Sequence, residues 1–411
     1  MMMRDWIHKE RQWYAQNDDP LPIVLSRGQG VWVWDTDGRR YLDMISAYSA
    51  VNYGHCHPRI LSALIQQAGG LSTCSRAVYH DKLGDFLAFL CQLTTMDMAL
   101  PMNSEAESVK TAIKAAKRWG YRHKGIPDNQ AEIVVIHQNF HGRTMGLIRF
   151  STDEGDRKDF GPFLPGFRAV PFGNSHTLAE VITANTCAVI TEPIQAEAGV
   201  IIPPSGWLKK VQQICQDNNV LLIVDEIQSG LGRTGKILSS HHEDVQPDAI
   251  LLGRSLGGGF LPVSAFAGRR EVLSNLNLEN HESTFGGNPL GSIVGLTSLQ
   301  VLRDEKLSER SAELGSYFLN RLRQIESPYI QDIRGLGLWI ALEIDPKWRS
   351  ARSICEQLLY HGILARELHK TTICLAPPLV INHEEINWAL TRIYQVLQTG
   401  GTIPVQVPLA F

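Results

Sequence analysis

The middle of the chain alternates short runs of β-branched residues with segments of helical periodicity. Four apolar runs are typical of buried strands: Ile133–His137, Cys187–Thr191, Val220–Val224 and Ile250–Leu252. Between them, the segment Gly206–Asn218 repeats its apolar residues at helical spacing. Strands that alternate with helices favour a mostly parallel sheet covered by helices on both faces. The predicted fold class is therefore α/β.

The two ends of the chain carry a different pattern. Gly30–Asp35 and Gly38–Leu42 predict a short hairpin. Toward the C-terminus, Leu336–Ile344 predicts a strand, and helices are predicted at Ala351–His361 and Glu384–Leu397. These elements indicate a smaller α+β unit, with which the early hairpin is expected to pack.

The chain has 411 residues, of which 44% are hydrophobic, so it can bury a large core in one big domain or two smaller ones. We predict an N-terminal segment (1–57) that packs with the small domain, a large domain (58–305) and a C-terminal small domain (306–411). Ligands of parallel sheets bind beyond the carboxyl ends of the strands. Asp225 directly follows Val220–Val224, so we expect it at that crevice.

Charge and cysteine usage exclude several classes of function. The formal net charge is −3 and no long basic run is present, which gives no support to a nucleic-acid or membrane partner. No segment is apolar for long enough to span a bilayer, and Met1–Gln16 lacks a secretory apolar region. The seven cysteines form no CxxC pair, which favours a cytoplasmic location. No metal is expected, since His55-Cys56-His57 has no matching second cluster.

Seven motifs together are more informative than any one alone. They are SAYSAVNYGH (Ser46–His55), FHGRT (Phe140–Thr144), EPIQAEAG (Glu192–Gly199), DEIQSGLGRTG (Asp225–Gly235), GRSLGGG (Gly253–Gly259), STFGGNPL (Ser283–Leu290) and APPLVI (Ala376–Ile381). Their order and spacing resemble the class III, fold-type I aminotransferases, and among them the ornithine aminotransferases. The resemblance runs from about Pro20 to Leu397. It implies a homodimer with a large sheet domain and a small domain from both chain ends, pyridoxal phosphate (PLP) as cofactor, and a small amino-acid-like ligand.

The resemblance also implies a cofactor site. Asp225 would pair with the pyridine nitrogen and keep it protonated, which makes the ring an electron sink. Phe140 and Ile227 would sandwich the ring, and Gln228 would bond its hydroxyl. The other implied cofactor contacts are Ser104, Glu105, Ala106, His141 and, from the partner subunit, Thr284. Without the resemblance, a buried acid at a strand end still favours function because it must be paired, whereas an aromatic and an aliphatic there are more often plain core.

Substrate contacts are implied in the same way. Arg143 would grip a substrate carboxylate in two-point fashion, although a lone loop arginine is usually solvated surface. Tyr48 would line the substrate pocket beside Glu197. Asp18 and Cys374 stand at two further substrate-contact positions of the family.

Arg254 is the largest departure from the family pattern. The resemblance places there the lysine that forms the Schiff base with PLP and then moves the substrate proton. A guanidinium stays protonated, so it supplies neither nucleophile nor base. Arg254, Glu197 and Asp225 are the candidate catalytic residues, and PLP is not expected to be held covalently through position 254.

Three more departures fall on functional positions. Glu105 replaces the glycine of a phosphate cup at a helix start, where backbone N–H groups face the phosphate. It either opposes the phosphate or points outward as a favourable first-turn acid. Cys374 replaces the arginine expected to pair with Glu197, which is thereby predicted to lack its partner. Asp18 replaces a tyrosine that contacts ornithine.

Four hypotheses follow. The first is a diverged protein that no longer transaminates and binds a small amino-acid-like or anionic ligand, with Glu105 and Arg254 paired in the old site. The second is an enzyme that holds pyridoxal or pyridoxamine phosphate without a covalent link, or that has altered chemistry on an ornithine-like substrate. The third is a regulatory partner subunit of an active homologue. An ordinary ornithine aminotransferase with a substitute amine is the least favoured.

Overall fold

A seven-stranded sheet forms the centre of the molecule. The computed structural model describes residues 3–15, 17–276 and 282–398. In sheet order, the strands are β4 (Met98–Met102), β10 (Ser264–Gly268), β9 (Ala249–Leu252), β8 (Leu221–Asp225), β7 (Thr186–Thr191), β5 (Glu132–Ile136) and β6 (Phe167–Val170). β10 is antiparallel to both neighbours, and the pairings from β9 to β6 are parallel. The predicted mostly parallel sheet of an α/β fold is confirmed.

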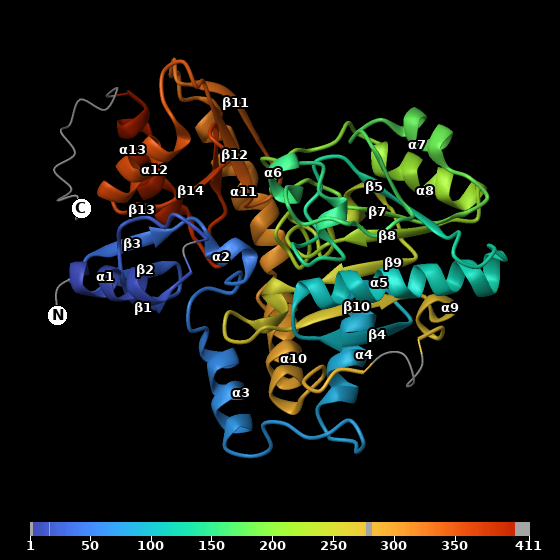
Figure 1. Cartoon of the computed structure of the whole chain (residues 1–411). Coiled ribbons are helices and arrows are strands. Elements are labelled where there is room, and N and C mark those ends of the chain that lie inside the picture. Colours follow the sequence, from blue (N-terminus) through green and yellow to red (C-terminus); the bar gives the residue numbers. More distant parts are fainter. Residues whose placement is uncertain (1–2, 16, 277–281, 399–411) are drawn as a thin grey trace.

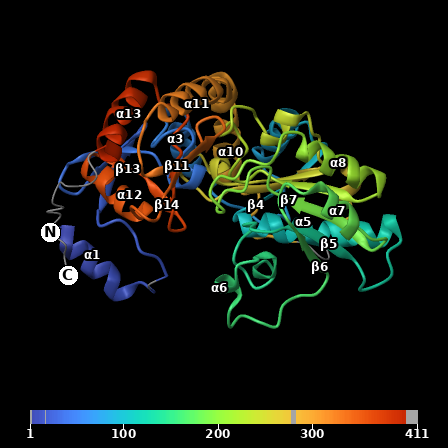
Figure 2. The same ribbon diagram turned by 90° about the horizontal axis from the view of Figure 1, so that it is seen from above.

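Helices cover both faces of this sheet (Figures 1 and 2). The helix α5 (Glu105–Trp119) packs on one face, and α7 (Ser175–Val181) and α8 (Trp207–Asp217) pack on the other. Alternate residues of β8 therefore enter different cores: Leu221 and Ile223 join α5, while Leu222 and Val224 join α8. Burial on both faces explains why the strand is a continuous apolar run rather than an alternating one.

The helix α5 begins where its sequence contains a capping box. Ser104 accepts the N–H of Glu107, and the Glu107 carboxylate accepts the N–H groups of Asn103 and Ser104. This reciprocal pairing satisfies N–H groups that have no intrahelical acceptor. The start of α5 is thus fixed at the carboxyl-end edge of the sheet.

Two four-stranded sheets lie beside the large one. The first contains β1 (Leu25–Gln29), β2 (Trp32–Asp35), β3 (Arg40–Asp43) and β13 (Ile363–Leu364), and the second contains β11 (Ile330–Gly335), β12 (Ile340–Ile344), β15 (Thr372–Leu375) and β14 (Arg366–Leu368). Because β13 pairs in parallel with β3, residues from both ends of the chain share one sheet. The division at residues 57/58 and 305/306 stays a prediction.

The remaining helices complete the layers seen in Figure 1. They are α1 (Met3–Trp13), α2 (Ser46–Ser49), α3 (Pro58–Ala68), α4 (Leu83–Thr94), α6 (Glu154–Arg157), α9 (Arg270–Leu273), α10 (Pro289–Asp304), α11 (Leu307–Arg323), α12 (Ala351–Tyr360) and α13 (His383–Gln398). Short turns of 3-10 or π type occur at Gly120–Lys124 (η1), Ile148–Phe150 (η2), Ser239–Glu243 (η3) and Arg254–Gly257 (η4). No helix in the described part of the chain is long and apolar enough to cross a membrane.

One predicted strand was too long. The prediction covered Leu336–Ile344, but β12 starts only at Ile340. Gly337 has a φ of 59°, and a Cβ there would lie 2.5 Å from the Thr234 carbonyl carbon, so the chain bends sharply against its neighbour. This close approach requires glycine and interrupts the strand.

Candidate functional site

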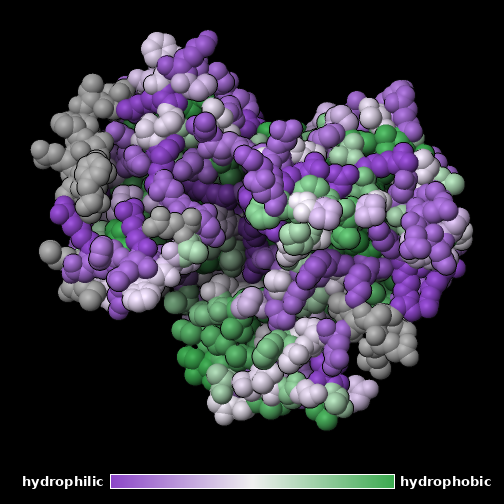
Figure 3. Space-filling model, viewed as in Figure 1, coloured by the Kyte–Doolittle hydropathy of each residue, from purple (hydrophilic) through white to green (hydrophobic). Residues whose placement is uncertain are grey.

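A cavity of about 310 Å³ lies where the carboxyl ends of the strands meet the start of α5. Nine of the predicted site residues line it: Glu105, Ala106, Phe140, His141, Arg143, Asp225, Ile227, Gln228 and Arg254. Its size is within the usual range for a small-molecule pocket. Figure 3 shows a recess of mainly hydrophilic surface near the centre of the molecule, between the part that contains the two small sheets and the part that contains the large sheet.

Asp225 is held as a buried, fully bonded carboxylate at the end of β8. Its Oδ2 lies 2.7 Å from His141 Nδ1, and its Oδ1 accepts the N–H of Ile227 at 3.1 Å. The His141 side chain is 0% exposed and that of Asp225 is 4% exposed. Burial alone would lower the pKa of His141, but the hydrogen bond and charge of Asp225 outweigh it and raise the pKa. The contact with Asp225 therefore favours the protonated form of His141 more than burial alone would.

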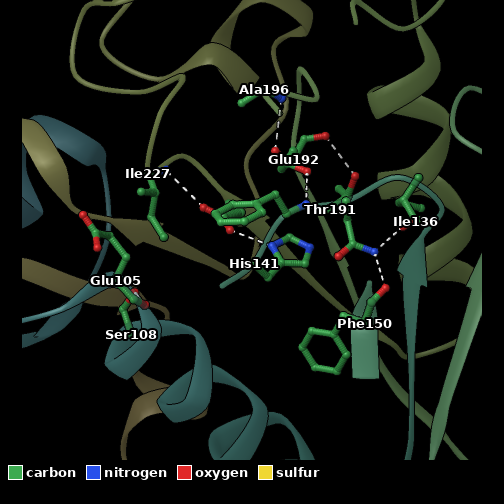
Figure 4. A network of polar contacts seen from close by, with 12 residues as sticks. Glu105, Ser108, Ile136, His141, Phe150, Thr191, Glu192, Ala196 and Ile227 are labelled. Carbon is green, nitrogen blue, oxygen red and sulfur yellow. Dashed lines mark hydrogen bonds and ion pairs between the residues drawn. The ribbon is translucent and has the colours of Figure 1, made fainter. Parts of the chain in front are cut away.

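Glu192 is a cavity residue that was not among the predicted site residues. Its carboxylate accepts the N–H groups of Phe140 at 3.0 Å and Ala196 at 3.2 Å (Figure 4). Burial, reinforced by the charge of Asp225, raises its pKa to about 7, although His141 acts in the opposite direction. Its position directly after β7 was the available sequence signal, as it was for Asp225 after β8. Near neutral pH, Glu192 can hold or release a proton beside Asp225.

Arg254 and Glu105 lie together at one end of the cavity. Arg254 Nε is 3.9 Å from Glu105 Oε1, and its Nη1 donates to the Tyr48 carbonyl oxygen at 2.7 Å. Burial lowers the pKa of Arg254, while Glu105 and Glu197 act to raise it. The hypothesis that Glu105 and Arg254 pair is confirmed, at the outer range of an ion pair. Glu105 is half-exposed yet lines the cavity, so it does not simply point outward.

The prediction that Glu197 lacks a partner is wrong. Arg366 Nη2 lies 2.5 Å from Glu197 Oε2, and Nη1 lies 3.4 Å from Oε1. Arg366 in β14 is the direct cross-strand partner of Cys374 in β15, so a guanidinium stands one strand away from the position where the resemblance places it. Gln228 also donates to Glu197, at 3.2 Å. The sequence shows Cys374 two residues before the APPLVI motif, but it does not show which residue pairs with Cys374 on the next strand, which is why Arg366 was missed.

Two of the predicted substrate residues, Arg143 and Glu197, line an adjoining groove of about 400 Å³. Arg143 lines it, is 66% exposed and donates to Asp156 Oδ1 at 2.7 Å. Tyr48 and Cys374 line a small neighbouring space with Glu197. The Arg366 Cζ lies 4.1 Å from the centre of the Tyr48 ring, close enough for a cation–π contact.

Three predicted residues lie elsewhere. Ser104 is the cap of α5, and its side chain is engaged by Glu107. Asp18 is exposed in a separate cavity formed with α1. Thr284 is exposed and does not line the cavity in the described part of the chain, so its predicted role across a subunit interface stays a prediction.

The cavity fits one part of PLP and not another. The predicted ring contacts Phe140, Asp225 and Ile227 line it together. At the other end, the Glu105 side chain already fills the space beside Gly253, since a Cβ on that glycine would lie 2.7 Å from Glu105 Cγ. A carboxylate thus stands at the helix start where a phosphate would bind. With Arg254 unable to supply an amine, these residues do not fit covalently held PLP, and no reaction step is assigned to it.

Nearly the whole chain is similar to known aminotransferases, both in sequence and in structure. Residues 13–397 match the family model described as aminotransferase class-III. The chain is 51% identical to an ornithine aminotransferase of Brevibacillus brevis, covering 95% of this chain and 97% of the relative, and 52% identical to that of an Exiguobacterium species, covering 96% and 97%. Among solved structures, the ornithine aminotransferase of Toxoplasma gondii superposes with a TM-score of 0.95 at 40% identity, covering 96% of this chain and 94% of that chain. That protein was crystallised in the presence of oxidised glutathione, and PLP is at partial occupancy in its active site.

Proposed function

The chain belongs to the class III aminotransferases, and we propose that it is an ornithine-aminotransferase-like member that does not carry out ordinary transamination. Instead, it binds a small amino-acid-like ligand across the cavity that Asp225 lines and the adjoining groove that Arg366 and Glu197 line. PLP is the cofactor that its family and relatives imply. The proposal concerns how this chain departs from them.

The observation that carries the proposal is the composition of the cavity wall. Arg254 stands where the resemblance predicts the reactive lysine, and none of the described residues that line the cavity is a lysine. Lys236, the nearest lysine in sequence, donates instead to the His241 carbonyl oxygen. Since a guanidinium remains protonated near neutral pH, the cavity offers no amine for covalent capture of a carbonyl group.

The internal ion pairs favour a zwitterion over a simple anion. Glu197 and Arg366 are each about one quarter exposed and neutralise one another. An amino acid could place its carboxylate on Arg366 and its ammonium group against the released Glu197. A simple anion would leave the partly buried Glu197 without a cationic partner, with only the neutral Gln228 donating to it, which is costly. This exchange supports an amino-acid-like ligand.

Two measurements on the full chain test the proposal. With PLP, ornithine and 2-oxoglutarate, wild-type protein is expected to give no product above the protein-free background. Titration calorimetry is expected to detect ornithine binding, with acetate as the anionic control and R366M weakening only the ornithine signal. Sustained turnover by the wild-type protein would refute the proposal, and so would ornithine binding no stronger than that of acetate.

A second candidate is an enzyme that holds pyridoxal or pyridoxamine phosphate without a covalent bond. It is favoured by the retained ring contacts, because Phe140, Asp225, Ile227 and Gln228 all line one cavity. Borohydride reduces the aldehyde of PLP in either case. After the treated protein is dialysed and given fresh PLP, this candidate predicts that product formation returns, whereas an enzyme with a substitute amine would stay inactive because its reduced cofactor remains attached.

We also propose that the protein forms a homodimer, as the resemblance implies. Thr284 is exposed in the single chain, which agrees with a contact made across an interface. Light scattering after size exclusion is expected to give twice the mass of the chain. A monomer that copurifies with an active homologue would instead support a regulatory subunit.

A further inference from the structure

Every arginine that lines the cavity or the adjoining groove already has a carboxylate of the same chain. The pairs are Arg143 with Asp156, Arg254 with Glu105, and Arg366 with Glu197. The site is therefore self-neutralised, and a bound anion would have to displace an internal acid. Of these acids, Asp156 lies in the four-residue helix α6, whereas Glu105 is the first residue of the 15-residue helix α5. The N–H groups of the first turn of such a helix have no intrahelical acceptor and attract anions.

Glu105 stands at the end of the cavity where α5 begins. Its backbone opens α5 next to Ala106, and both residues line the cavity. Its Cγ packs against Gly253 and its carboxylate reaches Arg254. Figure 4 shows this side chain extending from the start of α5 to the side on which Ile227 lies. A side-chain carboxyl group of the chain itself thus lies among the groups that would otherwise attract an anion from solution.

We infer that Glu105 is a built-in anion that makes the cavity selective for ligands without a phosphate group. This inference rests on the proposed function in that it concerns the same cavity, but it predicts a binding preference rather than an activity. A phosphate dianion would meet the Glu105 charge across a partly desolvated gap and would find Arg254 already paired. A neutral or zwitterionic ligand of similar shape meets no such repulsion, because it adds no net negative charge.

Pyridoxal and PLP form a matched pair of probes, since they differ only in the phosphate. Both are titrated into wild-type protein, E105Q and E105G, with the change in protein fluorescence reporting binding. E309Q is the control, because Glu309 is also a first-turn acid but on α11 and outside the lining of this cavity. Thermal melting checks that each variant is folded.

Wild-type protein and E309Q are expected to bind PLP no more tightly than pyridoxal. E105Q and E105G are expected to tighten PLP binding by at least about tenfold while leaving pyridoxal unchanged. The inference is overturned if wild-type protein already prefers PLP tenfold, if E105Q shifts both probes equally, or if folded E105G fails to bind PLP. Turnover of ornithine by wild-type protein would refute the proposed function without altering this preference, so the two failures are distinguishable.

Discussion

Replacing Arg366 with methionine removes the guanidinium that neutralises Glu197 while keeping most of the side-chain volume. Two unit charges 4 Å apart attract by about 4 kcal/mol at an effective dielectric constant of 20. Because the two side chains are 25% and 23% exposed, solvent screening reduces this to about 2 kcal/mol. We therefore expect R366M to lower the free energy of unfolding by about 2 kcal/mol at neutral pH, measured by urea denaturation followed by circular dichroism.

The same pair predicts a pH dependence. Burial alone would raise the pKa of Glu197, but Arg366 outweighs it, so the folded-state pKa lies below its ordinary value of 4.5. The stabilisation is thus present above the ordinary value and is lost as the pH falls through the folded-state pKa. R366M lacks this pair, so its stability should fall less than that of the wild-type protein as the pH is lowered. The two proteins should therefore have similar stabilities in acid.

Three variants control this experiment. A double-mutant cycle with E197Q isolates the pairwise energy. C374R in the R366M background should recover part of the stability, because position 374 is the cross-strand neighbour of position 366. R303M breaks an exposed pair with Asp304 and should cost under about 0.5 kcal/mol. A coupling energy between Arg366 and Glu197 below about 0.5 kcal/mol would refute the reasoning.

Three further predictions follow from other buried or paired groups. The pKa of His141 in the folded protein is raised above its ordinary value of 6.5. Its pairing with Asp225 therefore stabilises the fold fully below pH 6.5, and this stabilisation is lost as the pH rises through the folded-state pKa. H141Q should flatten the dependence of Tm on pH in calorimetry, and an unchanged slope would contradict this. The buried Arg233 donates to the carbonyl oxygens of Leu338 and Pro377, so R233M should cost over about 3 kcal/mol in urea denaturation, and a loss below about 1 kcal/mol would argue against these bonds. D156N should release Arg143 and tighten ornithine binding severalfold in calorimetry. Its stability change should stay within about 0.5 kcal/mol, because the Arg143 side chain of this pair is 66% exposed; an unchanged affinity would remove Arg143 from the ligand site.

The large sheet was predictable because its signals are local. Val220–Val224 and Cys187–Thr191 are continuous apolar runs. The observed β8 is shifted by one residue at each end, and β7 starts one residue earlier. Burial on both faces selects apolar residues at every position, so the pattern survives without knowledge of the partners. The interruption before Ile340 was not predictable, because it depends on the backbone near Thr234 that crowds Gly337.

The site, like the fold, has features that the sequence predicts and features that only the tertiary structure shows. The sequence by itself determined which chemical groups the cavity has available: Arg254 without an amine, Glu105 at a helix start, and Asp225 at a strand end. Only the tertiary structure decided how these charges are balanced, since ion pairs form between residues far apart in the chain. Cys374 suggested an unpaired Glu197, but strand pairing brings Arg366 from β14 to the same place. Side-chain chemistry is a property of each residue, whereas the neutralisation of a buried charge depends on whatever the fold places within a few ångströms of it.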